Sequence, residues 1–229
     1  MWCSILLFIS CILEVNGLLI FRRPYLKQHE SIRNIHSQCR STPQNEIIDE
    51  DYFDFPSQGD ESIKIGGRDM ITHVSLLDRS LRRLTGRGLY ERMNVQPSSP
   101  KGIYNTVCLN ERFVLISHGT EASPIYNFGN VAALQAFMRS WHDLMIPSAE
   151  SVVLRSQDET LRNELMQKVT DHGFVEGASG IRVRGDGKFI ELVDAVVWNC
   201  YDDDDSTYIG QAAFFDRKNC PILDKPELA

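Results

Sequence analysis

The 229-residue sequence lacks the short motifs that mark several common classes of enzyme and metal-binding protein. It contains no Cys-x-x-Cys pair, no Asn-x-Ser/Thr glycosylation sequon and no Gly-x-Ser-x-Gly elbow. A structural zinc site and a lipase-type hydrolase therefore have no support. Beyond the N-terminal region only Cys108, Cys200 and Cys220 remain, an odd number without paired spacing. We therefore expect no disulfide framework and no metal site.

A long hydrophobic run is missing as well, because the apolar stretch from Ile5 to Leu13 is too short to span a bilayer. This stretch ends in small or polar residues, and residues 1–17 are therefore interpreted as a secretory signal peptide. The positively charged start usual in such peptides is missing, and a buried core segment is the alternative. We expect no stable membrane insertion after this leader is removed.

The next segment is poor in acidic residues, with Glu30 alone against five Arg or Lys residues between 18 and 45. This composition is typical of organelle transit peptides. A signal peptide followed by such a segment resembles the two-part leaders of proteins that enter plastids surrounded by extra membranes, with Leu18 and Phe21 near the cleavage point. We expect a plastid location, and a secreted protein with a basic N-terminal tail is the alternative.

Basic residues are absent from Glu46 to Glu61, where seven residues are acidic. This pattern predicts a solvated linker, so residues 18–61 are assigned to a transit peptide plus linker. The formal net charge of -7 lies mostly in this segment. Neither nucleic acid nor an anionic membrane is an expected partner.

The remaining chain has the composition of a globular domain, which we place at 62–216 with a C-terminal tail at 217–229. An apolar stripe predicts a helix over 69–85 that ends at Gly86. Residues 112–119 and 124–130 predict two strands. Asn130 is placed to cap a following helix, whose buried face is formed by Val131, Leu134, Phe137, Met138 and Trp141.

A second helix is predicted by a capping box at Ser156 and Glu159, with Gly173 at its end. Three strands joined by hairpins complete the chain. Arg184-Gly185-Asp186 matches a cell-adhesion triplet, but Gly-Asp-Gly between two β-rich runs first of all predicts a hairpin. The acidic run Asp202 to Asp205 lacks the ligand spacing of a calcium loop and is interpreted as a solvated hairpin tip.

The order of these elements predicts an α+β fold with a PAS-like plan. Five antiparallel strands would carry helices packed on one face and an N-terminal flanking helix at 69–85. A small pocket would lie where the sheet meets the helices.

Five sequence blocks, in order, resemble the MEKHLA domain: "SLRRLTGRGLY", "FVLISHGTEASPIYNFGNVAALQAF", "GFVEGASGIRVRGDGKF", "VVWN" and "GQAAFF". This family includes free-standing bacterial proteins, which the chain resembles, and the C-terminus of plant class III homeodomain leucine-zipper proteins. The resemblance implies a PAS-like domain of poorly defined function. No homeodomain, zipper or basic region precedes the blocks, so the plant transcription role is not transferred.

Four residues are candidates for a ligand pocket: His118, Asn130, Trp198 and Gln211. Trp198 and Gln211 are expected to point from the sheet toward the helices. This expectation assumes that Ile190, Leu192, Val196 and Trp198 share one face and that no bulge shifts the register. For His118 the alternative is a hydrogen-bonded structural residue, and for the stretch Ser117 to Phe137 it is a fold nucleus.

The leading functional hypothesis is a sensory module that binds a small molecule of unknown identity. A ligand-free interaction module that forms a homodimer through helix 69–85 is the alternative. An enzyme is not expected and no catalytic residue is assigned, because His118, Glu121 and Asp194 are acid-base candidates without a paired nucleophile. Flavin photochemistry is disfavoured, because "PSAESVVLRSQ" has no cysteine. The sequence does not identify a cofactor.

Overall fold

The computed structural model describes residues 53–148, 152–153 and 167–224. The expected leader at 1–52 and the capping box at Ser156 and Glu159 lie outside these residues.

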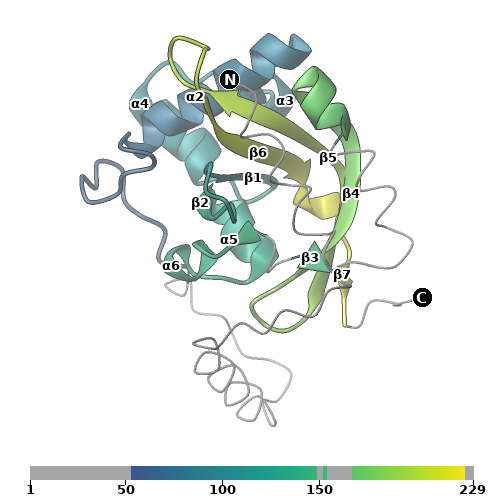
Figure 1. The fold of residues 1–229 in the computed structure, drawn as a ribbon. Helices are drawn as coiled ribbons and strands as arrows, with labels where there is room; N and C mark the ends of the chain where they lie inside the picture. The colour runs from purple at the N-terminus through teal and green to yellow at the C-terminus, as the bar shows by residue number, and fades with distance from the viewer. Residues whose placement is uncertain (1–52, 149–151, 154–166, 225–229) are drawn as a thin grey trace, which may run out of the picture. The chain divides into compact units, whose positions relative to one another are not determined.

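An antiparallel sheet forms the centre of the domain (Figure 1). Its strands run in the order β2-β1-β6-β5-β4-β3, and the short β7 pairs with β5. The α+β fold with five main strands, predicted from the sequence, is confirmed. The strands are β1 (Phe113–His118), β2 (Tyr126–Gly129), β3 (Val152–Val153), β4 (Phe174–Val183), β5 (Phe189–Tyr201), β6 (Tyr208–Asp216) and β7 (Ile222–Leu223).

The predicted N-terminal flanking helix is α2 (Met70–Thr85). Asp69 caps its start by accepting a hydrogen bond from the Thr72 amide, and Gly86 ends it in the left-handed conformation (φ 76°). Its apolar stripe is buried against the sheet. Short helical turns that the sequence did not predict follow: α3 (Leu89–Met93), α4 (Pro100–Ile103) and the π-helix η3 (Tyr104–Cys108).

The helix predicted after Asn130 is broken in two. α5 (Val131–Phe137) ends at Met138, whose backbone is left-handed (φ 48°), and Ser140 caps the separate helix α6 (Trp141–Leu144). The buried stripe is therefore correct for Leu134, Phe137 and Trp141 but not as one continuous helix. Residues 167–172 are helical, and η5 (Arg217–Asn219) follows β6. No helix in the described part of the chain is long and apolar enough to cross a membrane.

The sheet has two faces, which the register distinguishes because paired residues of an antiparallel sheet point to the same side. Ser117, Ala212 and Trp198 are paired across β1, β6 and β5 on the side of α2, here called the α2 face. The opposite side is the α5 face. A Cβ at Gly129 would there meet side-chain atoms of Leu144 in α6 and Ala133 in α5.

A β-bulge exchanges the faces along β5. Relative to β4, β5 has an extra residue next to Asp194, whose backbone is in the left-handed region (φ 56°). The prediction that Ile190, Leu192, Val196 and Trp198 share one face is therefore wrong. The first two lie on the α5 face and the last two on the α2 face.

Two exposed hairpin tips are each attached to a helix by side-chain contacts. The β4–β5 turn follows Arg184, as the sequence predicted, and this residue is only 6% exposed. At the β5–β6 tip, Asp203 pairs with Arg79 at 3.0 Å and Asp205 pairs with Arg83 at 3.2 Å. The acidic tip is largely exposed, as the sequence predicted, and its ion pairs also attach it to α2.

Candidate functional site

Three polar side chains lie in a line across the α5 face of the sheet, and we call them the polar row. Gln211 on β6 is the register partner of His118 on β1 and of Asn199 on β5. The Gln211 Nε2 donates to Asn199 Oδ1 at 3.0 Å, and Asn199 Nδ2 reaches the Val169 carbonyl at 3.4 Å. All three side chains are partly buried. The sheet therefore brings together two of the predicted residues, His118 and Gln211.

The environment of His118 favours a neutral imidazole. Burial lowers its pKa, and this effect outweighs the hydrogen bonds to Gly119 and Gln211 and the charge of Glu121, which all act in the opposite direction. Its Nδ1 lies 2.9 Å from the Gly119 carbonyl oxygen. A neutral imidazole in this position can donate or accept a hydrogen bond.

A glycine allows β6 to approach β1 closely beside this row. Gly210 has φ 135°, and a Cβ there would lie 1.9 Å from the carbonyl oxygen of His118. No other residue fits this approach without moving the strands. Gly210 thus fixes the spacing of His118 and Gln211.

Asn130 is fully buried and every polar atom of its side chain is used within the protein. Its Oδ1 accepts from the amides of Leu115 and Ala133, and its Nδ2 donates to the carbonyls of Val107 and Phe113. The predicted N-cap is confirmed. Its amide has no remaining hydrogen-bonding capacity for a ligand, so Asn130 is a structural residue.

Trp198 lies on the face opposite to the polar row. Its indole Nε1 donates to the Leu77 carbonyl in α2 at 3.2 Å, and the side chain is fully buried. Its partner on β6 is Ala212, whereas Gln211 pairs with Asn199. The expectation that Trp198 and Gln211 share a pocket is wrong, because their side chains lie on opposite faces of the sheet.

Asn199 is the site residue that sequence reasoning missed. It follows Trp198 directly, in an otherwise apolar part of β5. A carboxamide within an apolar strand needs a hydrogen-bonding partner, and this was the signal that could have identified it.

A second polar group is buried on the α2 face. His73 Nε2 lies 2.9 Å from Ser117 Oγ, which donates to Asn127 Oδ1 at 2.7 Å. Burial, followed by the charge of Arg68, lowers the pKa of His73 to about 4. Ser117 is 2% exposed. With its proton directed to Asn127 and no access for a substrate, Ser117 has no geometry for nucleophilic attack.

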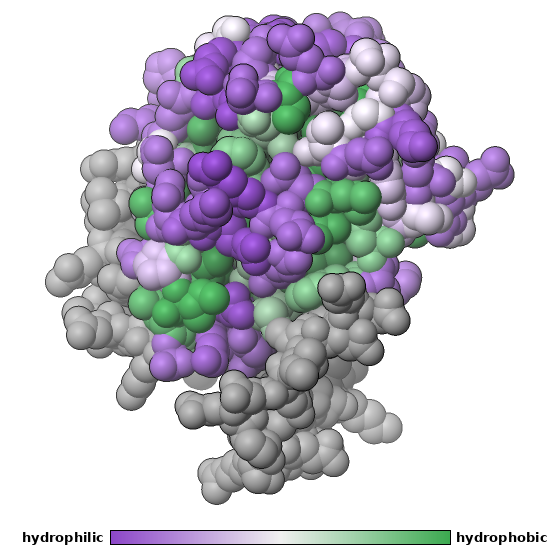
Figure 2. Space-filling view, turned by 180° about the vertical axis from the view of Figure 1, so that it is seen from behind, coloured by the Kyte–Doolittle hydropathy of each residue, from purple (hydrophilic) through white to green (hydrophobic). Residues whose placement is uncertain are grey.

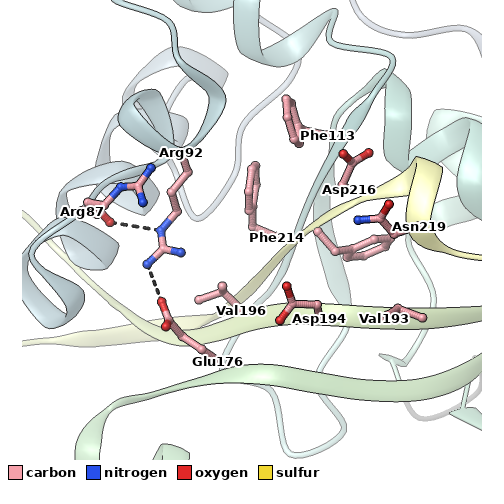
Figure 3. A pocket seen from close by; sticks show the side chains of 11 residues that line it. Arg87, Arg92, Phe113, Glu176, Val193, Asp194, Val196, Phe214, Asp216 and Asn219 are labelled. Atoms are coloured by element: carbon pink, nitrogen blue, oxygen red, sulfur yellow. Dashed lines mark hydrogen bonds and ion pairs between the residues drawn. The ribbon is translucent and has the colours of Figure 1, made fainter.

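A separate cleft of about 280 Å³ opens on the α2 face beside α3 (Figure 3). None of the four residues predicted for a pocket lines it. Its walls are Arg87, Arg92, Phe113, Glu176, Val193, Asp194, Val196, Phe214, Phe215, Asp216 and Asn219.

Metal-ligating side chains do not gather anywhere in the described ranges, since no group of three or more His, Cys, Asp or Glu residues occurs there. Cys108, Cys200 and Cys220 are free and buried.

The class of protein follows from the strand order and the helices inserted in it. The order β2-β1-β6-β5-β4, with α5 and α6 between β2 and β4 and α2 before β1, is that of a PAS-like α+β domain. The chain belongs to the MEKHLA domain family, whose model matches residues 71–219. This confirms the family resemblance of the sequence blocks. A search of curated proteins found no match.

Solved structures with similarity to the chain include several PAS and LOV domains. A PAS domain from Colwellia psychrerythraea has a TM-score of 0.35 and 15% identity, covering 45% of this chain and 85% of that chain. The LOV domain of the Erythrobacter litoralis EL346 blue-light activated histidine kinase has a TM-score of 0.38 and 15% identity, covering 45% and 94%. The PAS domain, in complex with ethanol, of a LuxR-family transcriptional regulator from Burkholderia thailandensis has a TM-score of 0.35 and 17% identity. This similarity covers 49% of this chain and 96% of that chain.

Proposed function

We propose that this domain is a sensory module that binds a small molecule on the α5 face of its sheet, at the polar row. The observation that carries the proposal is the convergence of His118, Asn199 and Gln211 from three different strands. The carboxamides of Asn199 and Gln211 have hydrogen-bonding capacity beyond the bonds described above, and a ligand can be a further partner of such partly buried groups.

The chemistry of the row indicates the kind of ligand. The two carboxamides offer both donors and acceptors, and His118 is neutral because burial lowers its pKa. No member of the row carries a formal charge at neutral pH. The row therefore suits an uncharged ligand with both a hydrogen-bond donor and an acceptor on one edge.

The placement of α5 supports a preformed site. Asn130 fixes the start of α5 to β1, and Arg184 and Gly185 at the β4–β5 tip bond the carbonyls of Ala136 and Phe137 near its end. The helix is thus tied to two distant parts of the sheet. A site between rigid elements requires little reorganisation when a ligand binds.

A ligand-free interaction module is the second candidate. The apolar stripe of α2 packs on the domain's own sheet, so a dimer through α2 would use the opposite side of the helix. The face in Figure 2 shows hydrophobic surface in patches divided by hydrophilic side chains. The large apolar residues most exposed in the described ranges come from different segments, namely Leu109, Ile125, Tyr208 and Ile222. This scatter gives the second candidate less support.

The test is retention of a small molecule by the purified full-length chain, measured by native mass spectrometry together with an absorption spectrum. We expect Gln211→Leu and Asn199→Leu to abolish retention while the domain stays folded, because each replaces an amide with an apolar group of similar volume. Gln58→Leu, the same change at an exposed position, is the matched control and should retain the molecule.

The opposite result favours the interaction module. If protein from its native source carries no small molecule, and Gln211→Leu raises the unfolding midpoint without altering self-association, the polar row is not a binding site.

A further inference from the structure

The cleft on the α2 face combines an aromatic floor with charged walls. The rings of Phe113 and Phe214 are stacked, with centroids 5.5 Å apart and planes inclined by 18°. Val193 and Val196 of β5 extend this apolar surface (Figure 3). Its volume of about 280 Å³ suits a molecule the size of one substituted aromatic ring.

Most charges around the cleft already have partners. Arg92 binds Glu176 at 2.6 Å at one end. At the other end, Asp216 binds Arg112, also at 2.6 Å. Within each pair the opposite charges neutralise each other. The two pairs therefore leave little net electrostatic attraction for a charged ligand.

Arg87, the remaining cation, is directed away from the floor. Its guanidinium donates to the carbonyl of Glu91 in α3 at 3.5 Å. Its carbonyl accepts from Arg92 Nε at 3.3 Å. Arg87 therefore belongs to the wall built by α3.

The carboxylate of Asp194 is the charge left over. The exposed carboxylate of Asp194 forms no hydrogen bond or ion pair with any residue in the described ranges, and neither does the exposed side-chain amide of Asn219. The left-handed backbone at the bulge brings Asp194 to the cleft, where it lies close to Val196 and Val193 in Figure 3. An unpaired carboxylate beside stacked rings attracts a cation more strongly than either feature alone.

The protein already places a cation over one ring of this pair. The guanidinium carbon of Arg112 lies 4.6 Å from the centroid of the Phe113 ring. This contact demonstrates that the surroundings of the rings accommodate positive charge.

We propose that the cleft binds a small organic cation with a flat apolar body. The ammonium or amidinium group would meet the Asp194 carboxylate and the Asn219 carbonyl oxygen, and the body would lie against Phe214 and Val196. This site does not depend on a ligand at the polar row, because the row lies on the α5 face of the sheet.

The experiment compares three probes of the same shape by titration calorimetry on the full-length chain at fixed ionic strength. The probes are phenethylammonium, neutral 2-phenylethanol and anionic 3-phenylpropionate. We expect phenethylammonium to bind about tenfold more tightly than the neutral probe, with the anion weakest, because a hydrogen-bonded charge contributes this much.

Asp194→Asn is the decisive variant, since asparagine also tolerates the left-handed conformation and should preserve the bulge. We expect this variant to bind phenethylammonium about tenfold more weakly and to bind 2-phenylethanol with unchanged affinity. Asp204→Asn removes the same charge at the β5–β6 tip and should leave phenethylammonium binding unchanged.

Three results would overturn the proposal. One is the absence of saturable phenethylammonium binding to the wild type, and another is equal affinity for all three probes. The third is an equal effect of Asp194→Asn and Asp204→Asn on the cation.

Discussion

Asn130 connects three elements, η3, β1 and α5, through four hydrogen bonds of one buried carboxamide. It caps α5 at the Ala133 amide, accepts from β1 at Leu115, and donates to the carbonyls of Val107 and Phe113. A cap on an exposed helix satisfies one or two amides that water could also reach. Here the partners are buried, so losing the side chain would leave them unsatisfied.

We therefore expect Asn130→Ala to lower the free energy of unfolding by about 3–5 kcal/mol, above the ~1 kcal/mol typical of an N-cap. Ser140→Ala, at the exposed cap of α6, is the control and should cost about 1 kcal/mol. Urea denaturation measures both. Equal losses would contradict the role of Asn130 as a joint between segments.

At the scale of elements, the β4–β5 hairpin is locked onto the end of α5. Arg184 donates to the Ala136 carbonyl at 2.8 Å and pairs with Asp186 at 2.9 Å, while the Gly185 amide donates to the Phe137 carbonyl at 2.7 Å. A cation is favoured at a helix C-terminus. The Arg-Gly-Asp triplet is thus a structural turn whose arginine is not available to an outside partner.

We expect Arg184→Met, which keeps the apolar stem, to lower the free energy of unfolding by about 2–4 kcal/mol, because Asp186 and the helix carbonyl lose a buried partner. Arg182→Met, two residues earlier, should cost less than about 1 kcal/mol, since within the described ranges the Arg182 side chain donates only to the adjacent Ile181 carbonyl. Thermal or urea unfolding compares the two variants. Similar values would argue against docking of the tip.

Local patterns in the sequence predicted the elements that local interactions determine. The stripe of α2, its stop at Gly86 and the cap at Asn130 follow from residues within one or two turns. The left-handed backbone of Met138 and Asp194 was not predictable in this way. Neither residue is a glycine, and each conformation depends on packing against distant segments.

The candidate site was predictable only in part for the same reason. His118 and Gln211 are polar residues in apolar strands, and this pattern is visible in the sequence. Which residues share a face depends on the register between strands, and a single bulge inverts it. Trp198 was therefore placed on the wrong face, and its neighbour Asn199 was overlooked.

At the scale of the whole molecule, α2 and the sheet act as one body. Hydrogen bonds join them in addition to apolar packing, and they pair His73 with Ser117, Leu77 with Trp198, and Ser80 with Tyr201. Each partner lies on a strand that also carries a residue of the polar row. A displacement of His118 or Asn199 would therefore act on α2 through the strand that carries that residue.

The buried histidine makes the stability of this body depend on pH. His73 has its pKa lowered to about 4, whereas an unfolded histidine titrates near ~6.5. Above pH ~6.5 His73 is neutral in both the folded and the unfolded chain and has no effect on the free energy of unfolding. Between ~6.5 and ~4 the unfolded chain takes up the proton first, so the free energy of unfolding falls, by roughly 3 kcal/mol at the lower end.

Urea midpoints between pH 4 and 7.5 measure this dependence. We expect His73→Gln to flatten the slope, leaving a smaller dependence due to His118, whose pKa burial also lowers. Carboxylates with lowered pKa, such as Asp216, act mostly below this window. An unchanged slope in His73→Gln would show that other groups set the pH dependence.

The three cysteines of the described domain lie in η3, in β5 and after η5, and all are buried. Burial raises the pKa of Cys108 to about 12 and also raises the pKa of Cys200 and Cys220. Oxidants and disulfides react with exposed thiolates, and these thiols are neither exposed nor ionised. The three thiols of the folded domain are therefore protected from oxidation, and the same sheet and helices can persist in a reducing or an oxidising solution.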